Sequence, residues 1–192
     1  QKGVDIVLAL DASQSMLATD ERPSRLAAMK EAVYQLREIS PSDRFALVVF
    51  AGRSYILTPM TVDDAALNLF LDNLDPTTVG QGGSSLSSAI RQATNLLAIG
   101  QSESGKAIVL MSDGEGFEDD QEVVNEARRA AGMGIRVITV GFGTRAGSQI
   151  PIRENGVVTV KKDESGATVV TRYSPTMLQE AARAGGDSFI PA

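Results

Sequence analysis

Three oxygen-bearing side chains stand at alternate positions directly after an apolar segment near the start of the chain. They are Asp11, Ser13 and Ser15, and the apolar residues 6–10 precede them. Hard cations such as Mg²⁺ take oxygen ligands and commonly keep some water or an open position. The end of a buried strand is also where open α/β sheets place their ligands. The spacing therefore predicts a divalent-metal site on a loop that a rigid core supports.

Two further loops carry side chains of the same chemistry. Ser84 follows a pair of glycines at the start of a predicted helix, and Asp113 follows the apolar residues 107–111. We expect both loops to lie at the same edge of a sheet as the first group, so that all of these oxygens surround one ion. Each residue alone is better explained as a turn former or a helix cap. The prediction of a metal site depends on their combination in this chain order.

The elements that must position these residues follow from apolar periodicity. Continuous apolar segments predict strands, and spacings of three and four predict helices. The predicted strands are 6–10, 45–50, 55–57, 107–111, 135–140 and 188–190. The predicted helices are 23–39, 63–71, 84–97, 122–131 and 177–184. Their alternation indicates an α/β fold with a doubly wound, mostly parallel central sheet, one short antiparallel edge strand and helices on both faces.

Residues 150–173 interrupt this alternation. The segments 157–161 and 167–172 alternate in period two on either side of the polar residues 163–166. This pattern favours a β-hairpin inserted between the fifth strand and the last helix. A docking arm for a partner and a structural flap are both open explanations for it.

Composition excludes several classes of function. The chain has no cysteine and no histidine, which excludes thiolate nucleophiles, Ser-His-Asp catalysis and histidine-ligated zinc. A formal net charge of −6 argues against a nucleic-acid partner, because such binding needs a basic face. No apolar run approaches the roughly 20 residues of a membrane span. The length of 192 residues predicts one domain over 1–192, which we expect to be excised from a longer protein.

The candidate metal ligands resemble those of the von Willebrand factor A family. Its metal-ion-dependent adhesion site reads Asp-x-Ser-x-Ser, then a distant Thr, then a distant Asp. Residues 11–15 match the first part, Asp113 matches the last, and Ser84 stands where the family usually has Thr. Serine keeps the hydroxyl but lacks the methyl group that restricts χ1 of threonine. Ser85 and Thr78 are alternative donors for this position.

Further segments resemble BatB-type members of the bacterial Bat (aerotolerance) branch of that family. These segments are 17–26, 43–52 and 140–144. The resemblance implies a link to aerotolerance and oxidative stress, and an inner-membrane protein whose anchoring helices lie outside this chain. It favours a periplasmic over a cytoplasmic domain. It also implies association with a MoxR-type AAA ATPase and with other A-domain proteins as partners.

The resemblance implies a binding module rather than an enzyme. In the family, the hydroxyls matching Ser13, Ser15 and Ser84 contact the metal directly. The carboxylates matching Asp11 and Asp113 often act through water, so the ion stays electrophilic and accepts an Asp or Glu of a protein partner. Such hydroxyl-rich ligation suits Mg²⁺ best, with Mn²⁺ or Ca²⁺ as alternatives. The residues expected at the partner-binding rim are Gln14, Met16, Gly83, Ser85 and Gly114.

Several alternatives stay open beside this interpretation. One alternative is a Mg²⁺-dependent phosphotransferase or phosphatase of the haloacid dehalogenase type, which also carries an acid after its first strand. The motif of those enzymes needs a second Asp two residues later as general acid and base, and Ser13 at this position cannot perform that role near neutral pH. A metal-free scaffold is the other alternative. For Met16 two positions are equally open: exposed at the rim of the site, or packed beneath the first helix. We expect the nearby acids to form a solvated run before a helix; they are Glu115, Glu118, Asp119 and Asp120.

Overall fold

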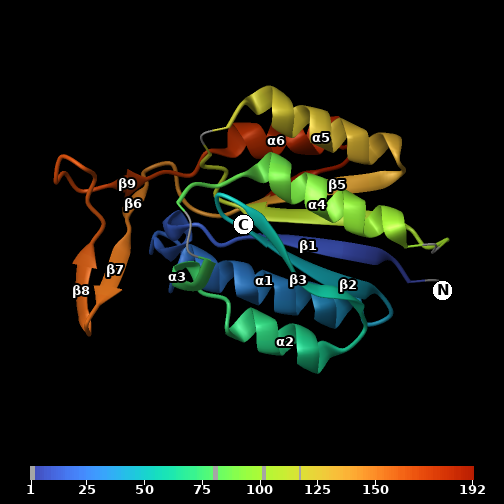
Figure 1. Ribbon diagram of the computed structural model, residues 1–192, viewed down its shortest axis with the longest axis horizontal. Coiled ribbons are helices and arrows are strands. Elements are labelled where there is room, and N and C mark those ends of the chain that lie inside the picture. The colour runs from blue at the N-terminus through green and yellow to red at the C-terminus, as the bar shows by residue number, and fades with distance from the viewer. Residues whose placement is uncertain (1–2, 80–81, 101–102, 117) are drawn as a thin grey trace.

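A six-stranded sheet in the order β10-β5-β4-β1-β2-β3 lies at the centre of the computed structural model (Figure 1). The structure describes residues 3–79, 82–100, 103–116 and 118–192. Neighbouring strands are parallel except for the antiparallel pair β2 and β3, which confirms the predicted mostly parallel sheet. The strands are β1 (Asp5–Asp11), β2 (Arg44–Phe50), β3 (Ser54–Thr61), β4 (Lys106–Ser112), β5 (Ile135–Gly141) and β10 (Phe189–Pro191).

Helices cover both faces of the sheet, with α4, α5 and α6 on one face and α1 and α2 on the other (Figure 1). The alternation of side chains along β1 supplies both contacts, because Val7 and Ala9 pack toward the first group of helices and Leu8 and Leu10 toward the second. Each predicted helix forms within a few residues of its expected bounds. The helices are η1 (Gln14–Leu17), α1 (Arg25–Ile39), α2 (Asp64–Asp72), α3 (Pro76–Val79), α4 (Leu86–Ile99), α5 (Asp120–Gly132) and α6 (Pro175–Ala184).

The topology creates a crevice at the carboxyl end of β1. This strand pairs with β2 on one side and β4 on the other. The helix that follows β1 packs on one face of the sheet, whereas the helix that follows β4 packs on the opposite face. Because these connections diverge, the loops after β1 and β4 frame an opening, as is general for open α/β sheets.

The antiparallel edge strand is longer than predicted. β3 extends over Ser54–Thr61 and continues through Pro59, whereas the predicted strand covers only 55–57. An edge strand accepts proline because one side of its backbone has no partner strand. The register with β2 shifts on either side of Leu47, and these irregularities let pairing continue past the proline.

The inserted segment forms a hairpin, but its main strands pair differently from expectation. β8 (Val157–Val160) pairs with β7 (Pro151–Glu154) across Asn155 and Gly156, which both have positive φ. An Asn-Gly turn of this kind is the strongest short-range hairpin signal, so it prevails over the polar turn at 163–166. That second turn still forms, with one bridge between Lys162 and Thr168. β6 (Ser148–Gln149) and β9 (Val170–Thr171) close the base of the insert.

Candidate metal centre

Asp11 anchors the predicted site at the end of β1. It is fully buried. One carboxylate oxygen accepts a hydrogen bond of 2.9 Å from the backbone N–H of Ser13. The other accepts hydrogen bonds from the hydroxyls of Ser84, at 3.2 Å, and Ser112, at 2.5 Å. Asp11 therefore joins the loop after β1, the loop after β4 and the start of α4.

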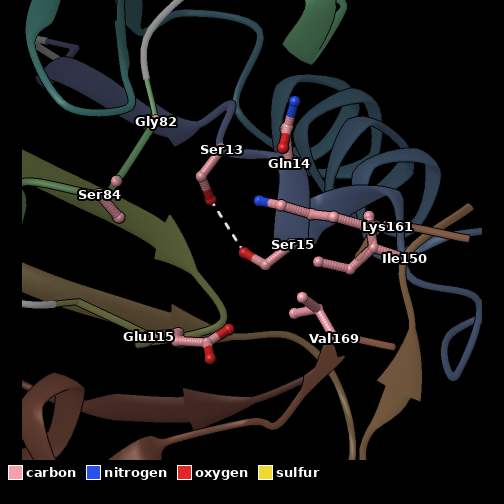
Figure 2. Close-up of a pocket in the computed structure, with 10 residues that line it drawn as sticks. Ser13, Gln14, Ser15, Gly82, Ser84, Glu115, Ile150, Lys161 and Val169 are labelled. Atoms are coloured by element: carbon pink, nitrogen blue, oxygen red, sulfur yellow. Dashed lines mark hydrogen bonds between the residues drawn. The ribbon is translucent and has the colours of Figure 1, made fainter. Parts of the chain in front are cut away.

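The three serines of the motif line one small cavity. Ser13, Ser15 and Ser84 all contribute to a cavity of about 110 Å³ (Figure 2). The hydroxyls of Ser13 and Ser15 lie 2.9 Å apart, and both side chains are almost completely buried. The structure thus brings together the hydroxyl donors that the spacing predicted. Among the candidates for the third hydroxyl, Ser84 donates a hydrogen bond to Asp11. The side chain of the alternative Thr78 lies outside the described part of the chain.

Asp113 joins the same cluster from the end of β4, but an unpredicted residue holds it. Its Oδ1 accepts the N–H of Glu115 at 3.0 Å, and its Oδ2 lies 2.9 Å from Nη1 of Arg25. Both partners of this ion pair have fully buried side chains. The following Gly114 has φ +75°, and a Cβ there would come within 2.0 Å of the carbonyl oxygen of Ser174. The chain can therefore turn away behind Asp113 only because this position is glycine.

Arg25 connects the candidate site to the loop before α1 and to the insert. Its guanidinium donates to both carboxylate oxygens of Asp20, at 2.7 and 2.8 Å, and to the side-chain and backbone oxygens of Thr171, at 3.1 and 3.4 Å. Together with the bond to Asp113, these contacts use all five N–H groups of the arginine. Although burial opposes the change, hydrogen bonds from Arg25 and Thr144 lower the pKa of Asp20 to about 2.

The sequence analysis missed Arg25, although the sequence contains a signal for it. A cation at the first position of a helix opposes the helix dipole, which favours anions there. Arg25 also stands four residues before Met29 and eight before Val33, on the apolar side of α1. A charged side chain that violates both preferences must have a buried partner. The identity of that partner, 88 residues away in the chain, has no local signature.

The charges of the cluster match a divalent cation. Asp20 and Asp113 pair with the guanidinium of Arg25, and Asp11 is buried close enough to Asp113 for their charges to interact. Fully ionised, the cluster has an excess of two negative charges, and buried charges need compensation. Burial, reinforced by the charge of Asp113, raises the pKa of Asp11, and burial also raises the pKa of Asp113. Within the described residues no three acidic side chains are arranged to hold an ion, so the donors that fit are two carboxylates and the serine hydroxyls.

The acidic residues after β4 have separate roles rather than one solvated run. Asp119 and Asp120 are exposed, and Asp119 caps α5 by accepting the N–H of Gln121. Glu118 instead reaches the start of α4, where its carboxylate accepts the N–H of Ser87 at 3.2 Å and the N–H of the preceding residue. Glu115 lines the cavity, and burial raises its pKa. The predicted solvated run is therefore correct for two of these acids and wrong for Glu115 and Glu118.

Two of the five residues expected at the partner-binding rim line the cavity. Gln14 and Gly83 line the cavity, whereas Ser85 and Gly114 do not. Ser85 caps α4 by accepting the N–H of Ser88. The assignment of Met16 to the rim is wrong, because its side chain is fully buried in the core on the α1 side of the sheet. The short helix η1 turns this residue inward, so the alternative of packing beneath α1 is correct.

The insert supplies the remaining wall of the cavity. Ile150, Lys161 and Val169 line it opposite the loop after β1 (Figure 2). Lys161 was not among the predicted site residues. Its contribution depends on how the insert folds back over the sheet edge, which no local pattern encodes.

Comparison with known proteins agrees with this architecture. A family model for the von Willebrand factor type A domain matches residues 6–115. A UPF0353 protein of Mycolicibacterium paratuberculosis is 35% identical over 152 residues, which cover 74% of this chain and 45% of that relative. The chain thus spans less than half of the length of this curated relative.

Solved structures extend the likeness to almost the whole chain. An aerotolerance-related membrane protein from Bacteroides fragilis is 34% identical with a TM-score of 0.92, covering 99% of this chain and 92% of that one. BatB from Bacteroides thetaiotaomicron is 33% identical with a TM-score of 0.92, covering 99% and 90%. No helix in the described part of our chain is long and apolar enough to cross a membrane. The chain belongs to the von Willebrand factor type A domain family, and its similarity extends to the BatB branch.

Proposed function

We propose that this domain binds a divalent cation, Mg²⁺ in preference to Mn²⁺ or Ca²⁺, and through it an acidic side chain of a protein partner. The observation that carries the proposal is the convergence of Ser13, Ser15 and Ser84 on one cavity. Asp11 accepts the hydroxyl of Ser84, and Asp113 directly follows β4, the strand that pairs with β1. Oxygen donors of this kind suit a hard cation.

The protein groups have distinct parts in this function. Asp11 orients the loop of Ser13 and the hydroxyl of Ser84 through hydrogen bonds, which leaves the oxygen lone pairs of the serines available to a cation. Arg25 engages one oxygen of Asp113 and so reduces the negative charge that this residue offers. A bound ion would supply a Lewis-acidic centre that attracts a carboxylate.

The burial of Asp11 favours a binding role over phosphoryl transfer. A carboxylate nucleophile needs access to its substrate, whereas Asp11 is fully buried and both of its oxygens accept hydrogen bonds. A phosphatase of the haloacid dehalogenase type would also need an acid in place of Ser13. A p-nitrophenyl phosphate assay with Mg²⁺ tests this alternative, and we expect no turnover above the background rate.

We further propose that the domain works in a membrane-associated bacterial complex, on the periplasmic side. The support is its likeness to an aerotolerance-related membrane protein. A MoxR-type AAA ATPase or another A-domain protein is the partner that we propose. Capture of the partner by the domain should fade in EDTA and return with Mg²⁺, whereas equal recovery in EDTA would remove the metal from the interaction.

Metal binding is tested by calorimetry and thermal unfolding with MgCl₂ and MnCl₂. A cation that binds the folded state adds about 2.7 kcal/mol of stability at a hundredfold excess over its Kd. Asp11→Asn should abolish this gain. Without metal, the variant should be as stable as the wild type or more so, because the substitution removes a buried charge that has no ion-pair partner among the described residues.

A matched pair of serines tests the assignment of the third hydroxyl. Ser84→Ala should weaken Mn²⁺ binding by about tenfold or more. Ser85→Ala makes the same chemical change one residue later; loss of the α4 cap should cost about 1 kcal/mol of stability and lower the affinity by no more than a few fold. A wild-type metal titration for Asp11→Asn would refute the site, and reversed results for the two serines would move the ligand to Ser85.

A further inference from the structure

Lys161 lies across the candidate metal cavity, at the end of β8. Its stem enters from the insert, and its ammonium group points between Gln14 and Ser15 toward the hydroxyl of Ser13 (Figure 2). The adjacent Lys162 is exposed and does not line the cavity. The insert therefore directs one of two successive lysines into the site.

The backbone on both sides of Lys161 is fixed by hydrogen bonds. Its N–H donates to the carbonyl oxygen of Ile150 at 2.9 Å, and its carbonyl oxygen accepts the N–H of Val169 at 2.9 Å. Ile150 and Val169 also line the cavity, and Ile150 is only 3% exposed. The lysine is thus anchored between two apolar neighbours before any ligand arrives, which lowers the ordering cost of a contact through it.

The ammonium group of Lys161 has no direct partner in the described part of the chain. Within the described residues it forms no ion pair of 4.0 Å or less and no hydrogen bond. Glu115 lines the same cavity and feels the charge of Lys161 at longer range, but its carboxylate accepts the hydroxyl of Thr171. A half-buried cation without a partner favours an anionic ligand.

We propose that Lys161 determines specificity for the carboxylate that the metal site accepts, by donating a hydrogen bond to the carboxylate oxygen that faces the insert. This inference rests on the proposed function. A carboxylate has two oxygens and can accept from two directions at once. An amide presents only one such oxygen, which cannot serve the metal and Lys161 in the same way. The selectivity of the site for Asp or Glu over Asn or Gln should therefore be greater than the metal alone would give.

The size of the cavity indicates how much of the partner enters it. Its volume of about 110 Å³ is well below the roughly 300–1,000 Å³ of typical small-molecule sites. One acidic head group fits this class of space better than a nucleotide or an organic cofactor. Ile150 and Val169 would flank the methylene groups of the incoming side chain.

Acetate is a suitable probe, because it is the head group alone. We would load the intact domain with Mn²⁺ and titrate acetate, following the water-proton relaxation that falls when a carboxylate displaces water from Mn²⁺. Lys161→Met keeps the apolar stem and removes the charge. We expect its apparent Kd for acetate to rise about tenfold, the size of one charge-assisted hydrogen bond. Lys162→Met is the matched control and should behave like the wild type, and Lys161→Arg should restore binding to within about threefold.

A prior Mn²⁺ titration of each variant separates the two proposals. Lys161→Met should bind Mn²⁺ as tightly as the wild type or more tightly, because loss of a nearby positive charge favours a cation. If Lys161→Met and the wild type bind Mn²⁺ and acetate alike, the role of Lys161 is refuted and the metal site stands. If the wild type binds no Mn²⁺ at all, the proposed function fails and this inference fails with it.

Discussion

At the scale of single residues, Arg25 shows how a buried charge can organise a site from outside the cavity. It does not line the cavity, yet it holds Asp113 on one side and Asp20 on the other. A guanidinium is fit for this task because its planar fork can satisfy several acceptors at fixed angles, whereas a lysine ammonium cannot. Its burial is tolerable only while those acceptors remain charged and in place.

Arg25→Met should therefore destabilise the domain strongly. Removing one partner of a buried ion pair leaves the other charge uncompensated, at a cost of about 3 kcal/mol or more. Urea unfolding with and without Mg²⁺ measures the effect. We expect Mg²⁺ to stabilise the variant more than the wild type, because the cation would replace part of the lost positive charge near Asp113. Arg91→Met, which removes an arginine 52% exposed and paired with Glu126, should cost less than about 1 kcal/mol. Equal losses for the two variants would contradict the structural role of Arg25.

At the scale of elements, the start of α4 is held from two directions. Ser85 caps the helix from within its own chain segment, and Glu118 adds a carboxylate from the loop before α5. An anion at a helix N-terminus satisfies unpaired N–H groups and interacts favourably with the helix dipole. Since Ser84 directly precedes this cap, the position of its hydroxyl depends on the loop that carries Glu118.

Glu118→Ala should thus weaken both the fold and the site. The loss of the charged cap should lower the free energy of unfolding by about 1–2 kcal/mol, measured by chemical denaturation. Mn²⁺ affinity should fall by a few fold, since Ser84 becomes less well ordered. Glu122→Ala alters an exposed acid in the first turn of α5 and should change stability by less than about 0.5 kcal/mol. An unchanged stability of Glu118→Ala would show that the cap contributes nothing.

At the scale of the whole molecule, the insert extends away from the sheet on the side where β1 and β4 end (Figure 1). Its base contributes Ile150 and Lys161 to the cavity, whereas its tip, with Val157 61% and Val158 58% exposed, projects from the body (Figure 1). On the side toward the body, Arg153 and Glu154 line a second cavity together with Gln14 and Leu17.

Shortening the tip should leave the domain and its metal site intact. Excision of Arg153, Glu154, Val157 and Val158 removes two cross-strand pairs of the hairpin. It keeps the Asn-Gly turn, and each remaining side chain stays on the same face of the hairpin. We expect the free energy of unfolding to change by less than about 1 kcal/mol, with an unchanged Mn²⁺ titration. Unfolding of the shortened domain would show instead that the tip supports the body. Loss of partner capture alone would identify the tip as a contact.

The sequence by itself determined the elements and the core of the site. Apolar periodicity reports burial, and burial along a single strand or helix is a local pattern, so the central strands and their helices could be predicted to within a few residues. The alternate positions of Asp11, Ser13 and Ser15 on one loop made their common direction predictable in the same way. Asp113 followed from strand order, because parallel strands end at one edge of the sheet, and Ser84 followed from its place at the start of a helix that begins at that edge.

Only the tertiary structure decided what surrounds those oxygens. The partner of Arg25, the reach of Glu118 to α4 and the entry of Lys161 all join segments far apart in the chain. The insert contains two turn signals, and its main strand pair, β7 with β8, forms across the Asn-Gly turn. A residue type and its spacing fix what a side chain can do, but packing between distant segments fixes which group it meets, and that choice depends on the shape of the whole core.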